Sequence, residues 1–280
     1  MNSYQIQTMQ TVINAMESHL DKRLDLETLA QTAGYSKHHF HHVFTSLTGL
    51  PIHDYILRRR LTQAAQQLVH TQKPILEIAL EAGYQSQQAF TSAFKGMYKQ
   101  TPRAFRKNNA FYPLQWKFTG VILPQPANLS LAWASLTDLD DWMALSAQTV
   151  SGFPGLEENS HRKQIQVAIR QHRAIVIRDQ THLIGALVFS QPAATIEFLA
   201  IHPQYSYRQI AAIFLDFLIR NRVLGPTIKI STFRANDKAD PGQRKAYEQL
   251  GFTASELLVE FGYPTQRMLL QVAPTESKNG

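Results

Sequence analysis

The sequence contains no cysteine among its 280 residues, which excludes disulfide bonds and thiolate chemistry. It also lacks an apolar run long enough to cross a bilayer, and its start, MNSYQIQTMQ, lacks the charged-then-apolar layout of a secretory signal. Charged residues make up only 18% of the chain and hydrophobic residues 44%, which excludes a disordered tail. We therefore expect a cytoplasmic protein with no membrane partner, and the length favours two domains.

The net charge of +7 is unevenly distributed along the chain. Residues 1–120 contain 13 Lys and Arg residues against 7 Asp and Glu, whereas residues 121–280 contain 15 against 14. Positive charge that is concentrated in one part of a chain attracts a phosphate backbone. This distribution predicts a nucleic-acid partner for the N-terminal part.

A helix-turn-helix pattern occupies residues 75–106. Apolar residues recur at helical spacing until Gly83 breaks the helix, Ser86 is placed to cap a new one, and Phe90 and Phe94 form its i,i+4 apolar seam. The face opposite the seam carries amide and hydroxyl groups that can bond base edges or phosphates. We predict DNA contacts at Ser86, Gln87, Gln88, Thr91, Ser92 and Lys95. A lone pattern of this kind is more often an ordinary amphipathic helix with a polar outer face.

The same pattern occurs a second time, upstream. Residues 33–35 read Ala-Gly-Tyr like residues 82–84, and Ser36, Phe40 and Phe44 correspond to the cap and seam of the later unit. Two such units joined by a long helix can place two recognition helices in successive major grooves from a single chain. The repeat therefore favours recognition helices over ordinary amphipathic ones.

Residues 5–107 resemble the AraC/XylS-type DNA-binding domain, and the stretches SQQAFT and QTPRAFR resemble its Rob-like branch. The resemblance implies DNA contacts in the first unit at Ser36, Lys37, His38, His41 and His42. In the closing helix, Arg103 and Arg106 are predicted to bind phosphates, which position a protein on DNA without selecting sequence.

The pattern over residues 52–68 predicts a connecting helix with three successive arginines, Arg58, Arg59 and Arg60. Three successive residues cannot share one face of a helix. We therefore expect at least one arginine to face solvent or phosphate and another to brace the two units.

The first recognition helix is rich in histidine. His38 and His42, at i,i+4 spacing, could share a metal ion, but no third ligand is close in sequence, so we predict no metal site. By the register of the Phe seam, His39 is expected to lean toward the interior.

The second half of the chain alternates between strand and helix patterns. We interpret residues 1–107 as the DNA-binding domain, 108–128 as a linker that partly packs on a domain, 129–272 as a second domain and 273–280 as a tail. Strands are expected at 129–136, 174–178, 183–190, 195–201, 227–232, 252–260 and 266–271, and helices at 138–148, 158–171, 207–223 and 241–250. The expected fold is multidomain, with an all-α N-terminal domain that contains two helix-turn-helix motifs and an α/β C-terminal domain.

Residues 129–272 resemble the GNAT-type N-acetyltransferase superfamily, through IEFLAIHP at 196–203 and AYEQLGF at 246–252. The resemblance implies a mixed sheet and a coenzyme A site at the start of the long helix, where backbone N–H groups cradle the pyrophosphate. The implied site consists of Leu199, Ile201, Ser206, Tyr207, Arg208, Gln209, Ile210 and Ala211. Gln209 replaces a glycine of the superfamily pattern and Ser206 replaces an Arg or Gln, so this coenzyme loop is degenerate.

The resemblance also assigns two catalytic positions. Tyr247 aligns with the tyrosine that protonates the leaving thiolate, and Glu197 stands where a base could lie. The alternatives are that Tyr247 packs under the sheet and that Glu197 is a strand-edge carboxylate.

Three hypotheses for the whole chain follow. The first is a sequence-specific transcriptional regulator, an activator, that binds double-stranded DNA and RNA polymerase and whose GNAT-like domain senses a small-molecule effector or acyl-coenzyme A. The second is a bifunctional regulator with an active N-acetyltransferase domain that uses acetyl-coenzyme A or another acyl-coenzyme A. The third makes the C-terminal domain a ligand-free scaffold for dimerisation or for polymerase.

Overall fold

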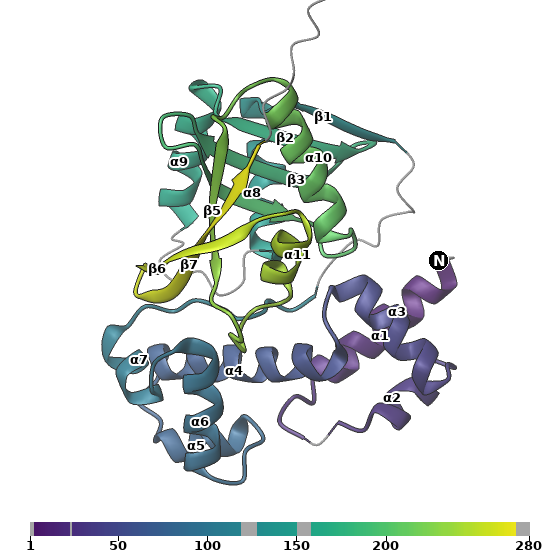
Figure 1. Cartoon of the computed structure of the whole chain (residues 1–280). Coiled ribbons are helices and arrows are strands. Elements are labelled where there is room, and N and C mark those ends of the chain that lie inside the picture. The colour runs from purple at the N-terminus through teal and green to yellow at the C-terminus, as the bar shows by residue number, and fades with distance from the viewer. Residues whose placement is uncertain (1–2, 23, 119–127, 150–157, 273–280) are drawn as a thin grey trace, which may run out of the picture. The chain divides into compact units, whose positions relative to one another are not determined.

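The computed structural model describes residues 3–22, 24–118, 128–149 and 158–272 (Figure 1). The chain divides into two compact units, the first formed by the described residues up to 118 and the second by those from 128 onward. Among the described helices, none combines the length and the apolar character that a membrane crossing requires.

The first unit is all-α, as predicted. Its helices are α1 (Ser3–Glu17), α2 (Leu26–Thr32), α3 (Lys37–Thr48), α4 (Ile52–His70), α5 (Ile75–Glu81), α6 (Gln87–Tyr98) and α7 (Pro102–Asn108). Helix α4 extends between the group formed by α1, α2 and α3 and the group formed by α5, α6 and α7 (Figure 1). The two helix-turn-helix motifs are α2–α3 and α5–α6, so α4 is the connecting helix.

The two motifs form their turns in the same way. The N–H of Tyr35 donates to the carbonyl of Ala30 at 2.9 Å, and the N–H of Tyr84 donates to that of Ala79 at 3.0 Å. The preceding glycines have positive φ angles, 68° for one motif and 81° for the other, a conformation that side chains disfavour. The two motifs therefore share this turn as far as the tyrosine, after which the later motif has one extra residue, Gln85, before its cap.

The phenylalanine seams form the cores of the two motifs. Phe40 and Phe44 are buried against the apolar stripe of α1, and Phe90 and Phe94 are buried in an aromatic cluster completed by α7. Burying one such side chain stabilises a fold by roughly 1.5–3 kcal/mol. The seams thus fix which faces of α3 and α6 are turned outward.

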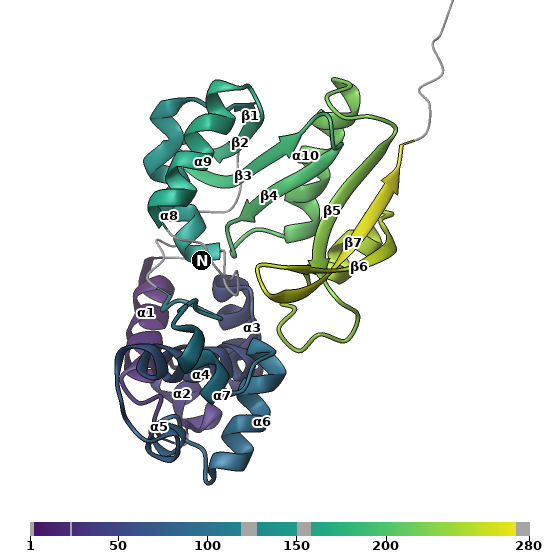
Figure 2. The same ribbon diagram turned by 90° about the vertical axis from the view of Figure 1, so that its left-hand side faces the viewer.

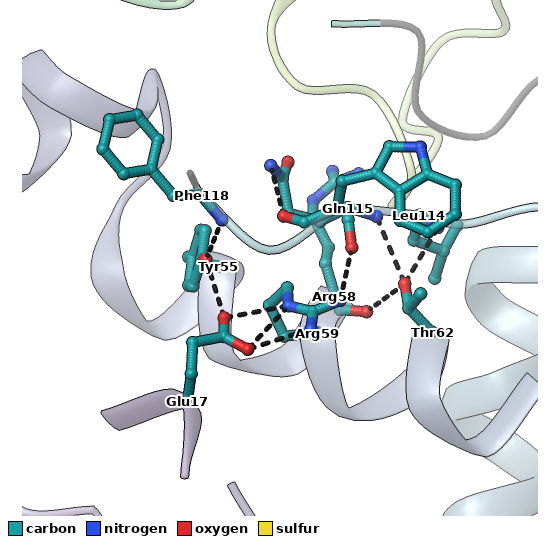
Figure 3. Close-up of polar contacts among 9 residues, drawn as sticks. Glu17, Tyr55, Arg58, Arg59, Thr62, Leu114, Gln115 and Phe118 are labelled. Atoms are coloured by element: carbon teal, nitrogen blue, oxygen red, sulfur yellow. Dashed lines mark hydrogen bonds and ion pairs between the residues drawn. The ribbon is translucent and has the colours of Figure 1, made fainter. Parts of the chain in front are cut away.

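Residues 111–118, which we call the return segment, contact the connecting helix (Figure 3). The hydroxyl of Thr62 accepts from the N–H groups of Leu114 and Gln115 at 3.0 and 3.2 Å, and the hydroxyl of Tyr55 accepts from the N–H of Phe118 at 2.9 Å. These residues lie in the stretch interpreted as a linker, and they belong to the first unit.

A buried ion pair joins α1 to the same part of α4. Arg59 forms a two-pronged contact with Glu17, with N–O distances of 2.9 Å, and donates its third nitrogen to the carbonyl of Gln115 (Figure 3). The side chains of Glu17 and Arg59 are only 4% and 9% exposed. The hydroxyl of Tyr55 donates to the same carboxylate at 2.7 Å. The burial of this phenol raises the pKa of Tyr55. Every charged group in this cluster therefore has a partner.

The second unit is an α/β unit with a mixed sheet, as the GNAT resemblance implied. Its strands are β1 (Leu129–Trp133), β2 (Ala174–Asp179), β3 (His182–Ser190), β4 (Thr195–Ile201), β5 (Thr227–Phe233), β6 (Thr253–Glu260) and β7 (Tyr263–Gln271). Their order is β1-β2-β3-β4-β5-β7-β6, and β4 and β5 are parallel while the other pairs are antiparallel.

Four α-helices and a short 3₁₀ turn complete the described part of the second unit. The helices are α8 (Leu139–Thr149), α9 (Glu158–Arg170), α10 (Tyr207–Arg220) and α11 (Gln243–Gln249), and the turn spans Leu136–Asp138. Helices α8 and α9 cover one face of the sheet, and α10 and α11 cover the other (Figures 1 and 2). Strands β4 and β5 pair only at their starts, as far as Ile196 and Ile230, and they diverge beyond these residues.

The buried ion pair yields a stability prediction. Replacement of Glu17 by alanine leaves the Arg59 guanidinium buried without its carboxylate, which we expect to lower the free energy of unfolding of the first unit by roughly 3–5 kcal/mol. The matched control is Glu81→Ala, because Glu81 forms an ion pair with Lys73 in which both side chains are more than one-third exposed. The control should cost about 1 kcal/mol or less. Equal losses in urea titrations followed by helical circular dichroism would contradict the role given to the buried pair.

Candidate nucleic-acid interface and coenzyme-binding region

Helix α6 presents the polar face that the sequence predicted. The hydroxyl of Ser86 caps the helix by accepting from the N–H of Ala89 at 3.2 Å. Gln87, Gln88, Ser92 and Lys95 are exposed, and Thr91 is half-buried at the edge of the face. The buried seam lies on the opposite side, so these side chains are free of core packing. An exposed amide at the start of a recognition helix can pair with an adenine edge.

Helix α3 presents the corresponding face with a different chemistry. Ser36 caps it by accepting from the N–H of His39 at 3.3 Å, while Lys37, His38 and His42 are exposed and His41 is half-buried. The positions that correspond in α3 and α6 are Lys37 and Gln87, His38 and Gln88, His41 and Thr91, and His42 and Ser92. The first motif thus offers imidazole rings where the second offers amides and hydroxyls.

One expectation about the histidines has an outcome in the structure. The expectation that His39 leans inward is wrong, because the residue is exposed and its ring rests edge-on against Tyr35 at 4.7 Å. The rings of His38 and His42 are 6.0 Å apart. No group of three metal-ligating side chains occurs in the described part of the chain.

The two arginines predicted to bind phosphate have different surroundings. Arg103 is exposed on α7. Arg106 is half-buried and donates to the carbonyl of Leu68 at 3.2 Å and to that of Lys73 at 2.6 Å. Arg106 therefore joins α7 to the end of α4, and two of its five N–H donors are used in doing so.

The three arginines of α4 are all turned inward. Arg58 and Arg59 are buried and Arg60 is half-buried, so the expectation that one would face solvent is wrong. Arg60 donates to the carbonyls of Leu20 and Lys22, both at 2.6 Å. Arg59 and Arg60 join α4 to α1 and to the segment after it, respectively.

In the second unit, the start of α10 carries the implied coenzyme loop. The hydroxyl of Ser206 accepts from the N–H of Gln209 at 3.4 Å, so the chain itself caps the helix end that would hold a pyrophosphate. Arg208 and Gln209 are exposed there, as is Ser206. Tyr207 is half-buried. The exposed groups of the first turn therefore include the cation of Arg208, which would attract a pyrophosphate, and the side chain of Gln209, which stands in place of the superfamily's glycine.

The remaining residues of the implied site contribute to the core. Ile210 and Ala211 are buried on the inner face of α10, and a Cβ at Gly185 of β3 would meet Ile210 at 3.2 Å. Leu199 and Ile201 lie on β4, where Ile201 is buried and pairs with Gly185. These side chains place α10 closely over the sheet.

Tyr247 is buried beneath the start of α10. Its hydroxyl lies 2.6 Å from that of Tyr207, and burial raises the pKa of both phenols. Asp240, whose carboxylate accepts from the N–H groups of Gly242 and Gln243, lies close enough to raise both pKa values further. Tyr247 is therefore a protonated phenol with a hydrogen-bond partner inside the chain.

Glu197 lies in an irregular part of β4. Val188 pairs with Phe198 and Phe189 pairs with Ile196, so Glu197 is the extra residue of a bulge. Its carboxylate is exposed and forms an ion pair with Arg173 at 3.0 Å. The structure does not bring Glu197 into contact with Tyr247 through any interaction among the described residues.

His161 is a buried titratable group that the sequence reasoning missed. It lies between α9 and α8, with its Nε2 atom 3.3 Å from the hydroxyl of Ser146 and its ring 5.0 Å from that of Phe198. Burial lowers the pKa of His161 to about 4. The signal was present in the sequence, because His161 shares the helical stripe of Ile165 and Ala168.

Two helix-turn-helix motifs with exposed polar faces, joined by one helix, define a double helix-turn-helix protein. A family model described as "Helix-turn-helix domain" matches residues 29–108. Regulatory protein SoxS of Salmonella typhimurium is 37% identical over 100 residues, which cover 36% of this chain and 94% of SoxS. The chain therefore belongs to the AraC family of helix-turn-helix transcriptional regulators.

Two other similarities differ in how much they cover. Transcriptional regulator Rob of Salmonella typhimurium is 42% identical over 109 residues, 39% of this chain, but the match spans only about a third of Rob, 36% of its length. A GNAT-family acetyltransferase structure from Bacillus cereus covers 52% of this chain and 99% of its own, with 17% identity and a TM-score of 0.42. That similarity is too low to indicate an activity.

The buried histidine yields a pH prediction. Because its pKa is lowered from 6.5 to about 4 in the folded state, its contribution to stability is present above pH 6.5 and is lost as the pH falls toward 4. The loss amounts to roughly 3 kcal/mol at most. We expect His161→Gln to flatten the acid limb of a plot of thermal midpoint against pH, whereas the exposed control His53→Gln should leave it unchanged. An acid limb of undiminished slope in His161→Gln would rule this out.

Proposed function

We propose that the first unit binds double-stranded DNA in a sequence-specific way as a single chain with two recognition helices. The supporting observation is the equivalence of the two motifs: their caps, their glycine turns and their buried seams correspond, and each leaves a polar face exposed. One helix, α4, carries both motifs. Two half-sites about one helical turn apart suit this arrangement.

The two faces suit different half-sites. Amide groups such as that of Gln88 can bond adenine through two hydrogen bonds, whereas imidazole groups on α3 can donate or accept depending on tautomer. Lys37, Lys95 and Arg103 are exposed cations that suit phosphates. An operator with two unlike halves is therefore the expected target.

The second unit is proposed to sense a small molecule or an acyl-coenzyme A. Two positions that the chemistry of acetyl transfer would use already have partners within the chain: the hydroxyl of Tyr247 is bonded to Tyr207, and Glu197 is paired with Arg173. These contacts favour binding over turnover. The role of activator and the contact with RNA polymerase rest on the family resemblance alone.

A bifunctional protein with N-acetyltransferase activity is the alternative. The divergence of β4 and β5 beyond Ile196 and Ile230 favours it, because an acyl chain could lie between strands that are no longer paired. Tyr247 lies beside the first turn of α10, to which Tyr207 belongs. If the hydroxyl of Tyr247 left that of Tyr207 and instead faced the leaving thiolate of the coenzyme, Tyr247 could act as the general acid.

The DNA assignment predicts a position-specific loss. With a duplex that the full chain selects from a random library, Gln88→Ala should cost roughly 1–3 kcal/mol at one base position and little at the others. Gln249→Ala, which removes an exposed amide from α11 in the second unit, serves as the control and should bind like wild type. Equal losses on the selected duplex and on random DNA for Gln88→Ala would refute direct readout by this residue.

The second unit can be tested with acetyl-coenzyme A on the full chain. The sensing hypothesis predicts a rise in thermal midpoint that grows with ligand concentration, without release of free thiol in the presence of amine or peptide acceptors. Thiol release that Tyr247→Phe abolishes, and that the control Tyr263→Phe retains, would establish the bifunctional alternative. The control removes a buried phenol hydroxyl that is bonded to Asp237. If acetyl-coenzyme A produces no shift in the thermal midpoint and no release of thiol, that result counts against it as the ligand.

A further inference from the structure

The side chain of Arg60, in the middle of α4, contacts the turn of the second helix-turn-helix motif and the segment that leads into the first. On one side, its Nε and Nη2 atoms donate to the carbonyls of Leu20 and Lys22, both at 2.6 Å. These two residues lie between α1 and α2, at the entry to the first motif. Two short hydrogen bonds to backbone carbonyls fix the direction of the guanidinium.

The other side of the same guanidinium lies against the turn of the second motif. A Cβ at Gly83 would lie 3.2 Å from the Cζ atom of Arg60 and 3.4 Å from its Nη1 atom. Arg60 and Tyr84 also interact electrostatically, since the cation opposes the rise in the pKa of Tyr84 that burial causes. Tyr84 in turn packs edge-on against Phe90 of α6, with ring centroids 5.5 Å apart. The contacts thus continue from Arg60 to the recognition helix.

The turn of the first motif has no such neighbour. A Cβ at Gly34 would meet nothing within 4 Å among the residues that the structure describes, although its φ of 68° resembles the 81° of Gly83. Both turns therefore need glycine for their backbone conformation. Only Gly83 also provides space for a close approach, so the contact with Arg60 is not a requirement of the turn itself.

We propose that Arg60 is a positioning residue that fixes the distance and angle between α3 and α6, and thereby the spacing of the two DNA half-sites that the chain accepts. The role rests on the proposed function of the first unit. Arginine suits it because a planar guanidinium can hold two carbonyls and still present a flat surface to a glycine turn, which a lysine ammonium cannot. Changing the spacing by one base pair moves a half-site by about 3.4 Å and rotates it by about a tenth of a turn.

The test compares duplexes that differ in spacing. The wild-type full chain first selects a bipartite duplex from a random library, and versions with one base pair inserted or removed between the halves are then prepared. We expect wild type to lose affinity by roughly tenfold or more on the altered duplexes. Arg60→Met, which keeps the apolar stem but removes the donors, should reduce this ratio to about threefold or less, and the exposed control Arg170→Met should not change it.

The two glycines provide an independent test that leaves the arginine in place. Gly83→Ala and Gly34→Ala both strain a positive-φ turn, but only Gly83→Ala pushes against Arg60. We expect Gly83→Ala to weaken the spacing preference and Gly34→Ala to retain it. In the Arg60→Met background, Gly83→Ala should not weaken the preference further. This arm also decides the matter if Arg60→Met fails to fold.

The outcomes separate the two levels of the proposal. If wild type, Arg60→Met and Gly83→Ala show the same preference for the spacing of the half-sites, the role of Arg60 alone is overturned. A uniform loss of affinity at every spacing, with the ratio unchanged, assigns Arg60 to general stability and also overturns it. Failure of wild type to select any duplex overturns the proposed function and this role together.

Discussion

The first unit depends on one constraint: the arginine side chains of the connecting helix α4 turn inward, and their charges need partners. A guanidinium that leaves water must find enough acceptors, because an unpaired buried charge costs several kcal/mol. Arg59 finds the carboxylate of Glu17 and the carbonyl of Gln115, and Arg60 finds two carbonyls after α1. Helix α1 and the return segment are therefore fixed to one short stretch of α4.

The duplication of the motif does not make the two halves alike in their surroundings. Both halves use the same cap, the same glycine turn and the same phenylalanine seam. They differ where they meet the connecting helix, since the second half receives Arg60 at its turn and Arg106 joins α7 to the end of α4. Repeats that share a local design can thus be held at a defined distance by contacts that are not themselves repeated.

Local patterns allowed most of the fold to be predicted, whereas the partners of individual polar side chains could not be predicted. The strand at 195–201 and the starts of α9, β2 and α10 agree with expectation because apolar periodicity and capping are local properties. Strand β7 begins at Tyr263 instead of 266, because Pro264 is accommodated beside Val259 of β6 beyond the last pair with β5.

In the candidate site, too, the features set by local patterns could be predicted and the partners of polar side chains could not. The exposed faces of α3 and α6 follow from the phase of the seams, whereas the inward direction expected of His39 was wrong. The inward direction of Arg59 and Arg60, by contrast, depends on acceptors that are about 40 residues away in the chain, as the sequence separations of their bonds show. Likewise, the bond between Tyr207 and Tyr247 spans 40 residues and leaves no trace in either local pattern.

The return segment bears on how such a chain can evolve. The hydrogen bonds that hold it lie wholly within the first unit, on Tyr55, Arg59, Thr62 and Tyr98. Its last described residue, Phe118, is buried and is held by a hydrogen bond to Tyr55 of α4. A recombination point placed after this residue would exchange whatever is fused downstream and would leave these hydrogen bonds of the return segment in place.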